Sequence, residues 1–68
     1  MYKEDFLEYQ GYHGTIEYSI EDRCFYGEVI NLEKDTIAYE GRNFKELEKD
    51  FEGAIEDYLI FKRTNNER

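Results

Sequence analysis

Residues 43–61 read NFKELEKDFEGAIEDYLIF, and this stretch decides the fold. Apolar side chains recur in it every three or four residues, the spacing that places them on one face of an α-helix. Asn43 is a residue type preferred at a helix N-cap, and Glu46 follows three positions later, at capping-box spacing. We therefore expect a helix from about Asn43 to Phe61. Its apolar face would comprise Phe44, Leu47, Phe51, Ala54, Ile55 and Tyr58, with Leu59 on the flank.

Three strand patterns precede the predicted helix. Residues 12–20 alternate between apolar and polar side chains, and residues 23–30 do the same. The polar residues between these two runs are few enough for a hairpin connection. Residues 36–41 form a third, shorter run that leads into the helix.

This order predicts an α+β fold: a three-stranded antiparallel sheet with one C-terminal helix packed on one face (β-β-β-α). Residues 1–11 add either an extended lead-in or a short first strand segment. The face under the helix is expected to carry Ile16, Tyr18, Phe25, Val29, Ile37 and Tyr39. Among the tyrosines, a core position is favoured for Tyr18, Tyr39 and Tyr58.

The same alternation makes the opposite face of the sheet acidic. It would carry Glu17, Glu28 and Glu40, one from each predicted strand, together with His13 and Tyr26. Large amphipathic rings often serve as binding anchors. Tyr26 is therefore interpreted either as such an anchor or as an ordinary surface side chain.

A second acidic surface is predicted along the helix. Glu48, Glu52 and Glu56 form a ladder with a spacing of four residues. Like charges at this spacing destabilise a helix slightly. The ladder is either a tolerated feature of a solvated flank or a contact surface for a basic partner.

Length and charge limit the classes of function. The 68 residues leave room for a single domain, expected over residues 1–63, with a flexible polar tail over residues 64–68. The formal net charge of −8 at pH 7 argues against contact with phosphate backbones. It favours a basic protein partner, although an acidic surface can also serve solubility alone.

The sequence gives little support for catalysis. His13 is the single histidine and Cys24 the single cysteine, too few for a zinc site of the usual type or an internal disulfide. By alternation both point to the same face, so a Cys-His nucleophile is an alternative to a surface histidine and a half-buried thiol. We expect no enzymatic activity, no cofactor and no metal. Without a signal-peptide pattern or a bilayer-length apolar run, a cytoplasmic location is expected.

Several short motifs follow one another in a distinctive order between Leu7 and Phe61. They are Tyr12-x-Gly14, Glu21-Asp22, Phe25-Tyr26-Gly27-Glu28-Val29, Asp35, Tyr39-Glu40-Gly41, Glu46-Leu47, Phe51, Ala54 and Asp57-Tyr58-Leu59. In this order the motifs resemble the HicB-like antitoxin domain of type II toxin-antitoxin pairs. Each motif is degenerate alone, so the order carries the resemblance.

The resemblance implies an antitoxin with a partial ribonuclease H-like fold and no nuclease activity of its own. Its partner would be a small, basic, HicA-like toxin that cleaves messenger RNA, and homodimers or higher oligomers are usual in the family. Many members carry a DNA-binding segment after this domain, whereas only residues 64–68 follow here, so direct nucleic-acid binding is not expected.

The expected contact surface for the toxin is the acidic sheet face with Glu17, Tyr26, Glu28 and Glu40; the second choice is the ladder Glu48, Glu52 and Glu56. Two other classes of function stay open. One is a stand-alone dimerising interaction module without a toxin. The other is an enzyme, for which His13, Cys24 and Glu28 would be the residues to consider.

Overall fold

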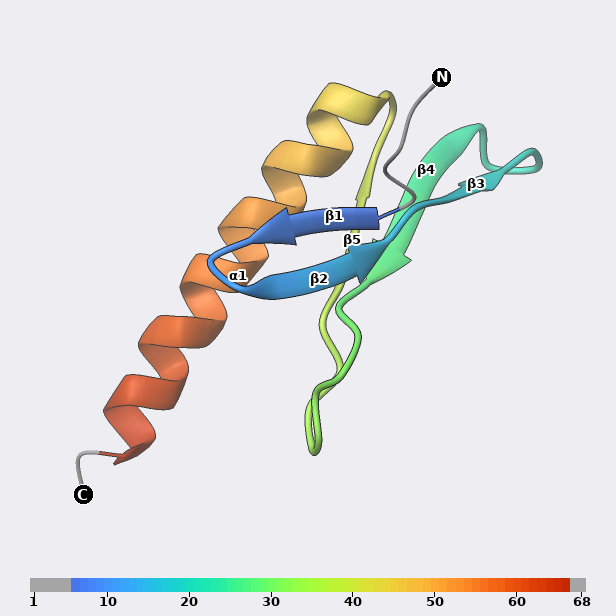
Figure 1. Cartoon of the computed structure of the whole chain (residues 1–68). Coiled ribbons are helices and arrows are strands. Elements are labelled where there is room, and N and C mark those ends of the chain that lie inside the picture. Colours follow the sequence, from blue (N-terminus) through green and yellow to red (C-terminus); the bar gives the residue numbers. More distant parts are fainter. Residues whose placement is uncertain (1–5, 67–68) are drawn as a thin grey trace.

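The computed structural model describes residues 6–66, with the backbone alone for residues 64–66. Its elements are β1 (Phe6–Tyr9), β2 (Tyr12–Thr15), β3 (Glu17–Ser19), β4 (Cys24–Glu28), β5 (Ala38–Gly41) and α1 (Phe44–Asn66). Strands β3, β4 and β5 form a three-stranded antiparallel sheet, β1 and β2 form a two-stranded sheet, and α1 packs on them (Figure 1). The predicted α+β class is confirmed, and the N-terminal segment contributes a strand of its own.

The strand predicted over residues 12–20 is broken at Ile16 into β2 and β3. Both halves nevertheless pair in the same register with residues 24–29: Gly14 lies opposite Val29, and Glu17, three residues later, lies opposite Tyr26, three residues earlier. The alternation of faces therefore continues through the break. This continuity explains why the sequence pattern looks like a single strand.

Tyr39 of β5 contacts the chain directly before the break. Its hydroxyl donates a hydrogen bond to the carbonyl oxygen of Thr15 (2.8 Å), while the Thr15 hydroxyl accepts the N–H of Glu28 (3.0 Å). Two glycines leave room for these groups. A Cβ on Gly14 would overlap the Tyr39 hydroxyl, and one on Gly27 would overlap the Thr15 carbonyl. Glycines within strands often mark such close approaches.

Two tight connections form the hairpins. Gln10 and Gly11 join β1 to β2 with φ values of 53° and 86°, and a two-residue type I′ turn requires two such positive values. Between β3 and β4, Arg23 has a φ of 56°, and the Ser19 hydroxyl accepts the N–H of Asp22 (3.1 Å). The predicted hairpin at the polar break is confirmed.

The core lies where α1 crosses the strands. Its buried side chains are Leu7, Val29, Tyr39, Leu47, Phe51 and Ile55. Leu47, Phe51 and Ile55 of the predicted apolar face are at most 1% exposed, and Phe51 lies between the other two along the helix. Half-buried Tyr9, Tyr12, Ile16, Phe25, Leu32, Ile37 and Leu59 surround this cluster.

The start of α1 matches the sequence prediction closely. The Asn43 side-chain oxygen accepts the N–H of Glu46 (2.8 Å), which confirms the N-cap. The Glu46 carboxylate accepts the N–H of Arg42 (3.0 Å), one residue before the position that a standard capping box would use. Two backbone N–H groups at the helix start are thereby satisfied.

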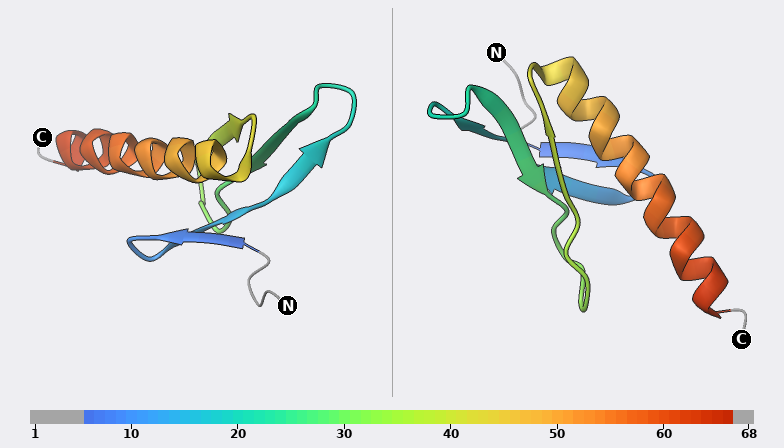
Figure 2. Two further views of the ribbon diagram at one scale, coloured as in Figure 1. Left: turned by 90° about the horizontal axis from the view of Figure 1, so that it is seen from above. Right: turned by 180° about the vertical axis from the view of Figure 1, so that it is seen from behind.

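Some expectations at the ends of the core differ from the structure. Tyr18 is 51% exposed and the predicted core position is wrong, because α1 packs on β5, β1 and β4 and leaves β3 largely uncovered (Figure 2). Phe44, in the first turn of α1, is exposed as well. The helix continues to Asn66, so residues 64–66 of the predicted tail are helical, whereas residues 67–68 lie outside the described part. No helix within residues 6–66 is long and apolar enough to cross a membrane.

Candidate partner-binding surface

Glu17, Tyr26 and Glu40 form a row across three strands. Glu17 of β3 lies opposite Tyr26 of β4, which in turn lies opposite Glu40 of β5. Buried Tyr39 immediately precedes Glu40, so strand alternation places the row on the face away from α1. Each of the three side chains is exposed, and Tyr26 is 44% exposed.

Glu28 completes the predicted surface, which we call the open face: Glu17, Tyr26, Glu28 and Glu40. Glu28 lies two residues beyond Tyr26 on β4, opposite Ala38, and it is exposed. The backbone of the surface is held in place at its edges. The N–H of Glu28 donates to Thr15, and the N–H of Glu40 donates to the carboxylate of Asp50 on α1 (3.0 Å). The structure thus brings together all four sheet residues predicted for the site.

Apolar side chains continue this side of the molecule toward β1. The N–H of Ile30 donates to the carbonyl oxygen of His13 (2.9 Å), and the Phe6 ring meets the His13 ring edge-on at 5.1 Å. Ile30 and Phe6 are both exposed. Glu8 lies opposite His13, with its carboxylate 3.9 Å from the imidazole. The alternation of Phe6 and Glu8 with Leu7 and Tyr9 is the sequence signal that could have predicted this extension.

The ladder on α1 is separate from the open face. The Tyr9 hydroxyl of β1 donates a 2.5 Å hydrogen bond to the Glu56 carboxylate, and this bond raises the pKa of Tyr9. Glu56 therefore ties α1 to the β1–β2 hairpin. Glu52 is half-buried and Glu48 is exposed. Of the three ladder residues, Glu48 is therefore the one that is exposed and forms no hydrogen bond among the described residues.

His13 and Cys24 are far apart along the sheet. In the common register His13 lies beside residue 30, whereas Cys24 lies opposite Ser19. Six residues of strand separate the two positions, roughly 20 Å at the usual rise. This separation contradicts a Cys-His nucleophile formed within one chain. Among residues 6–66 no group of three or more His, Cys, Asp or Glu side chains is arranged to hold a metal ion.

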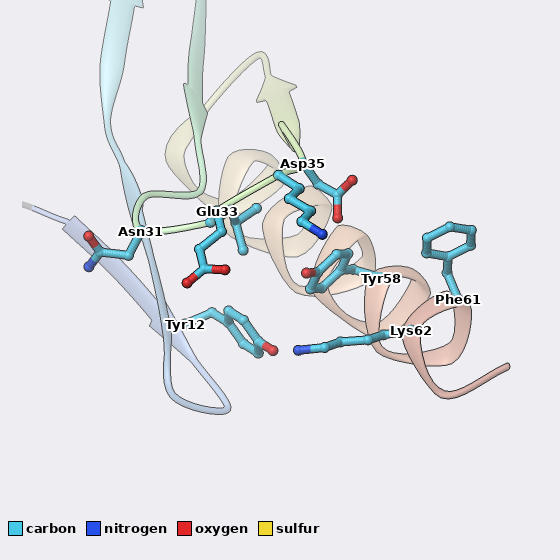
Figure 3. A pocket seen from close by; sticks show the side chains of 9 residues that line it. Tyr12, Asn31, Glu33, Asp35, Tyr58, Phe61 and Lys62 are labelled. Atoms are coloured by element: carbon cyan, nitrogen blue, oxygen red, sulfur yellow. The ribbon is translucent and has the colours of Figure 1, made fainter. Parts of the chain in front are cut away.

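A cleft of about 550 Å³ lies between the loop after β4 and the last turns of α1 (Figure 3). Its lining residues are Tyr12, Asn31, Leu32, Glu33, Lys34, Asp35, Tyr58, Phe61 and Lys62. The Tyr12 and Tyr58 rings meet edge-on at 5.9 Å, and the Lys62 ammonium lies 5.8 Å from the centre of the Tyr58 ring. Charges of both signs line the cleft, so it does not select one kind of ligand by charge.

No family model, curated protein or solved structure matches this chain. The residues and their geometry are therefore the basis for a functional proposal.

Proposed function

We propose that this protein is a HicB-like antitoxin that binds and neutralises a small, basic, HicA-like toxin through the open face. The observation that supports the proposal best is the exposed row of Glu17, Tyr26 and Glu40 on a sheet face that α1 leaves uncovered. A tyrosine between carboxylates suits a cationic protein surface. The ring supplies a contact that can be desolvated, and the carboxylates supply charge complementarity.

The chemistry of the partner follows from its substrate. A nuclease that binds messenger RNA must present basic groups to the phosphates. An acidic face can occupy those groups in place of RNA, and a net charge of −8 accelerates the encounter. The ordered motifs between Leu7 and Phe61 support the choice of a HicA-like toxin among the possible basic partners.

The alternative is a stand-alone interaction module that dimerises and has no toxin partner. The exposed side chains of the β3–β4 hairpin favour it, since Tyr18 and Ile20 are apolar and largely uncovered. Dimerisation through the hairpin edge and binding of a toxin through the open face could occur on one chain, because they use different surfaces, but the two proposed functions exclude each other. They are separated by whether a small basic toxin is encoded in the adjacent reading frame.

The first test is co-expression with the HicA-like toxin encoded next to this protein. We expect growth to be rescued and the two proteins to co-purify. Rescue without a stable complex, or a complex without rescue, contradicts neutralisation by direct binding.

The second test maps the surface by charge reversal. A variant with Glu17, Glu28 and Glu40 changed to Lys should associate at least tenfold more slowly at low salt, because exposed charges act mainly on encounter. The matched control carries Glu21→Lys, Glu33→Lys and Asp57→Lys, the same change in net charge at exposed positions elsewhere. If both variants slow association equally, the effect is one of net charge and the open face is not the docking surface.

A further inference from the structure

Among residues 6–66, strand β3 lies at the edge of its sheet. It pairs with β4 on one side, and no described strand lies along the other. The N–H of Ile30 bonds to His13, and antiparallel pairs alternate between bonded and non-bonded, so Glu17 and Ser19 are the positions that bond to β4. The N–H and C=O of Tyr18 therefore point outward, toward this edge.

Apolar side chains flank this edge. Tyr18 is the central residue of β3, and Ile16 and Ile20 lie just before and just after this strand. Their spacing of two residues would place all three on one face if the strand extended by one residue at each end. Ile20 is 81% exposed, and Tyr18 is half exposed although its ring meets Phe25 edge-on at 4.9 Å. Natural edge strands usually carry a lysine, a proline or a covering element that blocks pairing. Residues 16–20 read IEYSI and contain neither lysine nor proline; the protecting features that β3 does have are its length of three residues and the charge of Glu17.

We propose that two copies of this protein pair through β3, antiparallel, about a two-fold axis at Tyr18. In this register Tyr18 exchanges both backbone hydrogen bonds with the partner's Tyr18. Ile16 lies opposite the partner's Ile20, so the most exposed apolar side chain of the hairpin gains an apolar neighbour. The interface is isologous, and its self-complementarity comes from the apolar residues at both ends and at the centre of IEYSI.

The charges select this register over its neighbours. With the axis one residue earlier, Glu17 would face the partner's Glu17; with the axis one residue later, Glu17 would face the partner's Glu21. Like charges directly opposite each other destabilise a strand pair. With the axis at Tyr18, Glu17 faces the partner's Ser19, which is neutral.

The pairing does not depend on the proposed antitoxin function, and it would place the open faces of both copies on the same side of one six-stranded sheet.

The sign of a charge at position 19 tests the register. Ser19→Lys would create two symmetric pairs with the partner's Glu17, whereas Ser19→Glu would create two repulsive ones. Both substitutions lose the Ser19–Asp22 hydrogen bond, so Ser19→Ala is the common reference. By sedimentation equilibrium at low salt, we expect the lysine variant to dimerise roughly tenfold more tightly than the alanine variant and the glutamate variant roughly tenfold more weakly.

Amide hydrogen exchange gives an independent readout on the unmodified protein. Exchange at the Tyr18 amide should slow as the protein concentration rises, while the Glu17 and Ser19 amides, already bonded to β4, should change less. Ile20→Lys should abolish this concentration dependence with the melting temperature of the monomer unchanged, because the Ile20 side chain is exposed.

Three results would overturn the proposal. The first is a chain that stays monomeric at millimolar concentration in both the wild type and Ser19→Lys. The second is a dimer whose affinity does not follow the sign of the charge at position 19, since such a dimer uses another surface or register. The third is a monomeric full-length chain that dimerises once residues 1–5 are deleted, because the N-terminal segment would then be the occupant of the edge.

Discussion

The sheet under α1 and the β3–β4 hairpin carry the same alternation of apolar and polar residues, yet they differ in burial. Under α1, Val29 and Tyr39 are nearly inaccessible, whereas Tyr18 and Ile20 on the hairpin are exposed. The difference is the path of the helix, which follows β5 and diverges from the hairpin (Figure 2). Alternation decides which face a side chain takes. Burial depends on what covers that face, and none of the described elements covers the hairpin.

The largest expected contrast between the two regions comes from truncating an aromatic ring in each. Phe51→Ala removes a fully buried ring and should destabilise the fold by about 3 to 5 kcal/mol, enough to unfold a domain of this size. Tyr18→Ala removes a half-exposed ring and should cost about 1 kcal/mol or less. Urea denaturation of the monomer measures both. Equal losses would show that the hairpin belongs to the core after all.

Substituting alanine for two different glycines should change the stability of the fold in opposite directions. Gly27→Ala would force a Cβ into the backbone carbonyl of Thr15 and should cost about 2 to 3 kcal/mol. Gly53→Ala lies within α1, where no described atom lies within 4 Å of an added Cβ, and should stabilise by up to about 1 kcal/mol. Thermal melting of both variants checks the prediction. A tolerated Gly27→Ala would show that the break at Ile16 can relax.

The local features of the fold could be predicted from the sequence, and the long-range ones could not. The helix, its Asn43 cap and the central place of Phe51 follow from spacing within a few residues. The open face follows from alternation, because the break at Ile16 does not change the register. At the break, the Thr15 carbonyl bonds to the Tyr39 hydroxyl from 24 positions away, a contact that no local pattern indicates. The exposure of Tyr18 depends on where α1 lies, which no local pattern specifies.

Tyr39→Phe tests the contact between β5 and the break. The substitution keeps the ring and removes the hydroxyl that donates to the Thr15 carbonyl, so it should cost about 1 to 2 kcal/mol at neutral pH. Within the hairpin, Tyr26→Phe removes an exposed hydroxyl and should leave the stability nearly unchanged. Guanidinium denaturation at pH 7 separates the two outcomes. A neutral Tyr39→Phe would mean that the Thr15 carbonyl finds another donor.

The same tyrosine predicts how stability depends on alkaline pH. Burial raises the pKa of Tyr39 from 10.0 to about 12. The folded state therefore holds this proton more tightly than the unfolded state. The resulting contribution to stability is fully present below pH 10 and is lost as the pH rises from 10 to 12. Tyr39→Phe should flatten the pH dependence of the free energy of unfolding in this window. An unchanged slope would show that other groups cause the alkaline loss.

The smallest expected effects come from two side chains that cap backbone N–H groups, one in each region. Asn43 caps the helix over the core, and Ser19 caps the turn of the exposed hairpin. Asn43→Ala should cost about 1 kcal/mol, because the N–H groups at a helix start depend on such acceptors. Ser19→Ala should cost about 0.5 kcal/mol or less, since water can replace the hydroxyl in an exposed turn. Thermal denaturation of the monomer, at concentrations below any dimerisation, compares them. A larger loss of stability for Ser19→Ala than for Asn43→Ala would contradict this expectation. It would mean that the hydrogen bond in the turn contributes more to the stability of the hairpin than its exposed position suggests. The edge of such a hairpin would be rigid enough to bind a partner strand without further ordering.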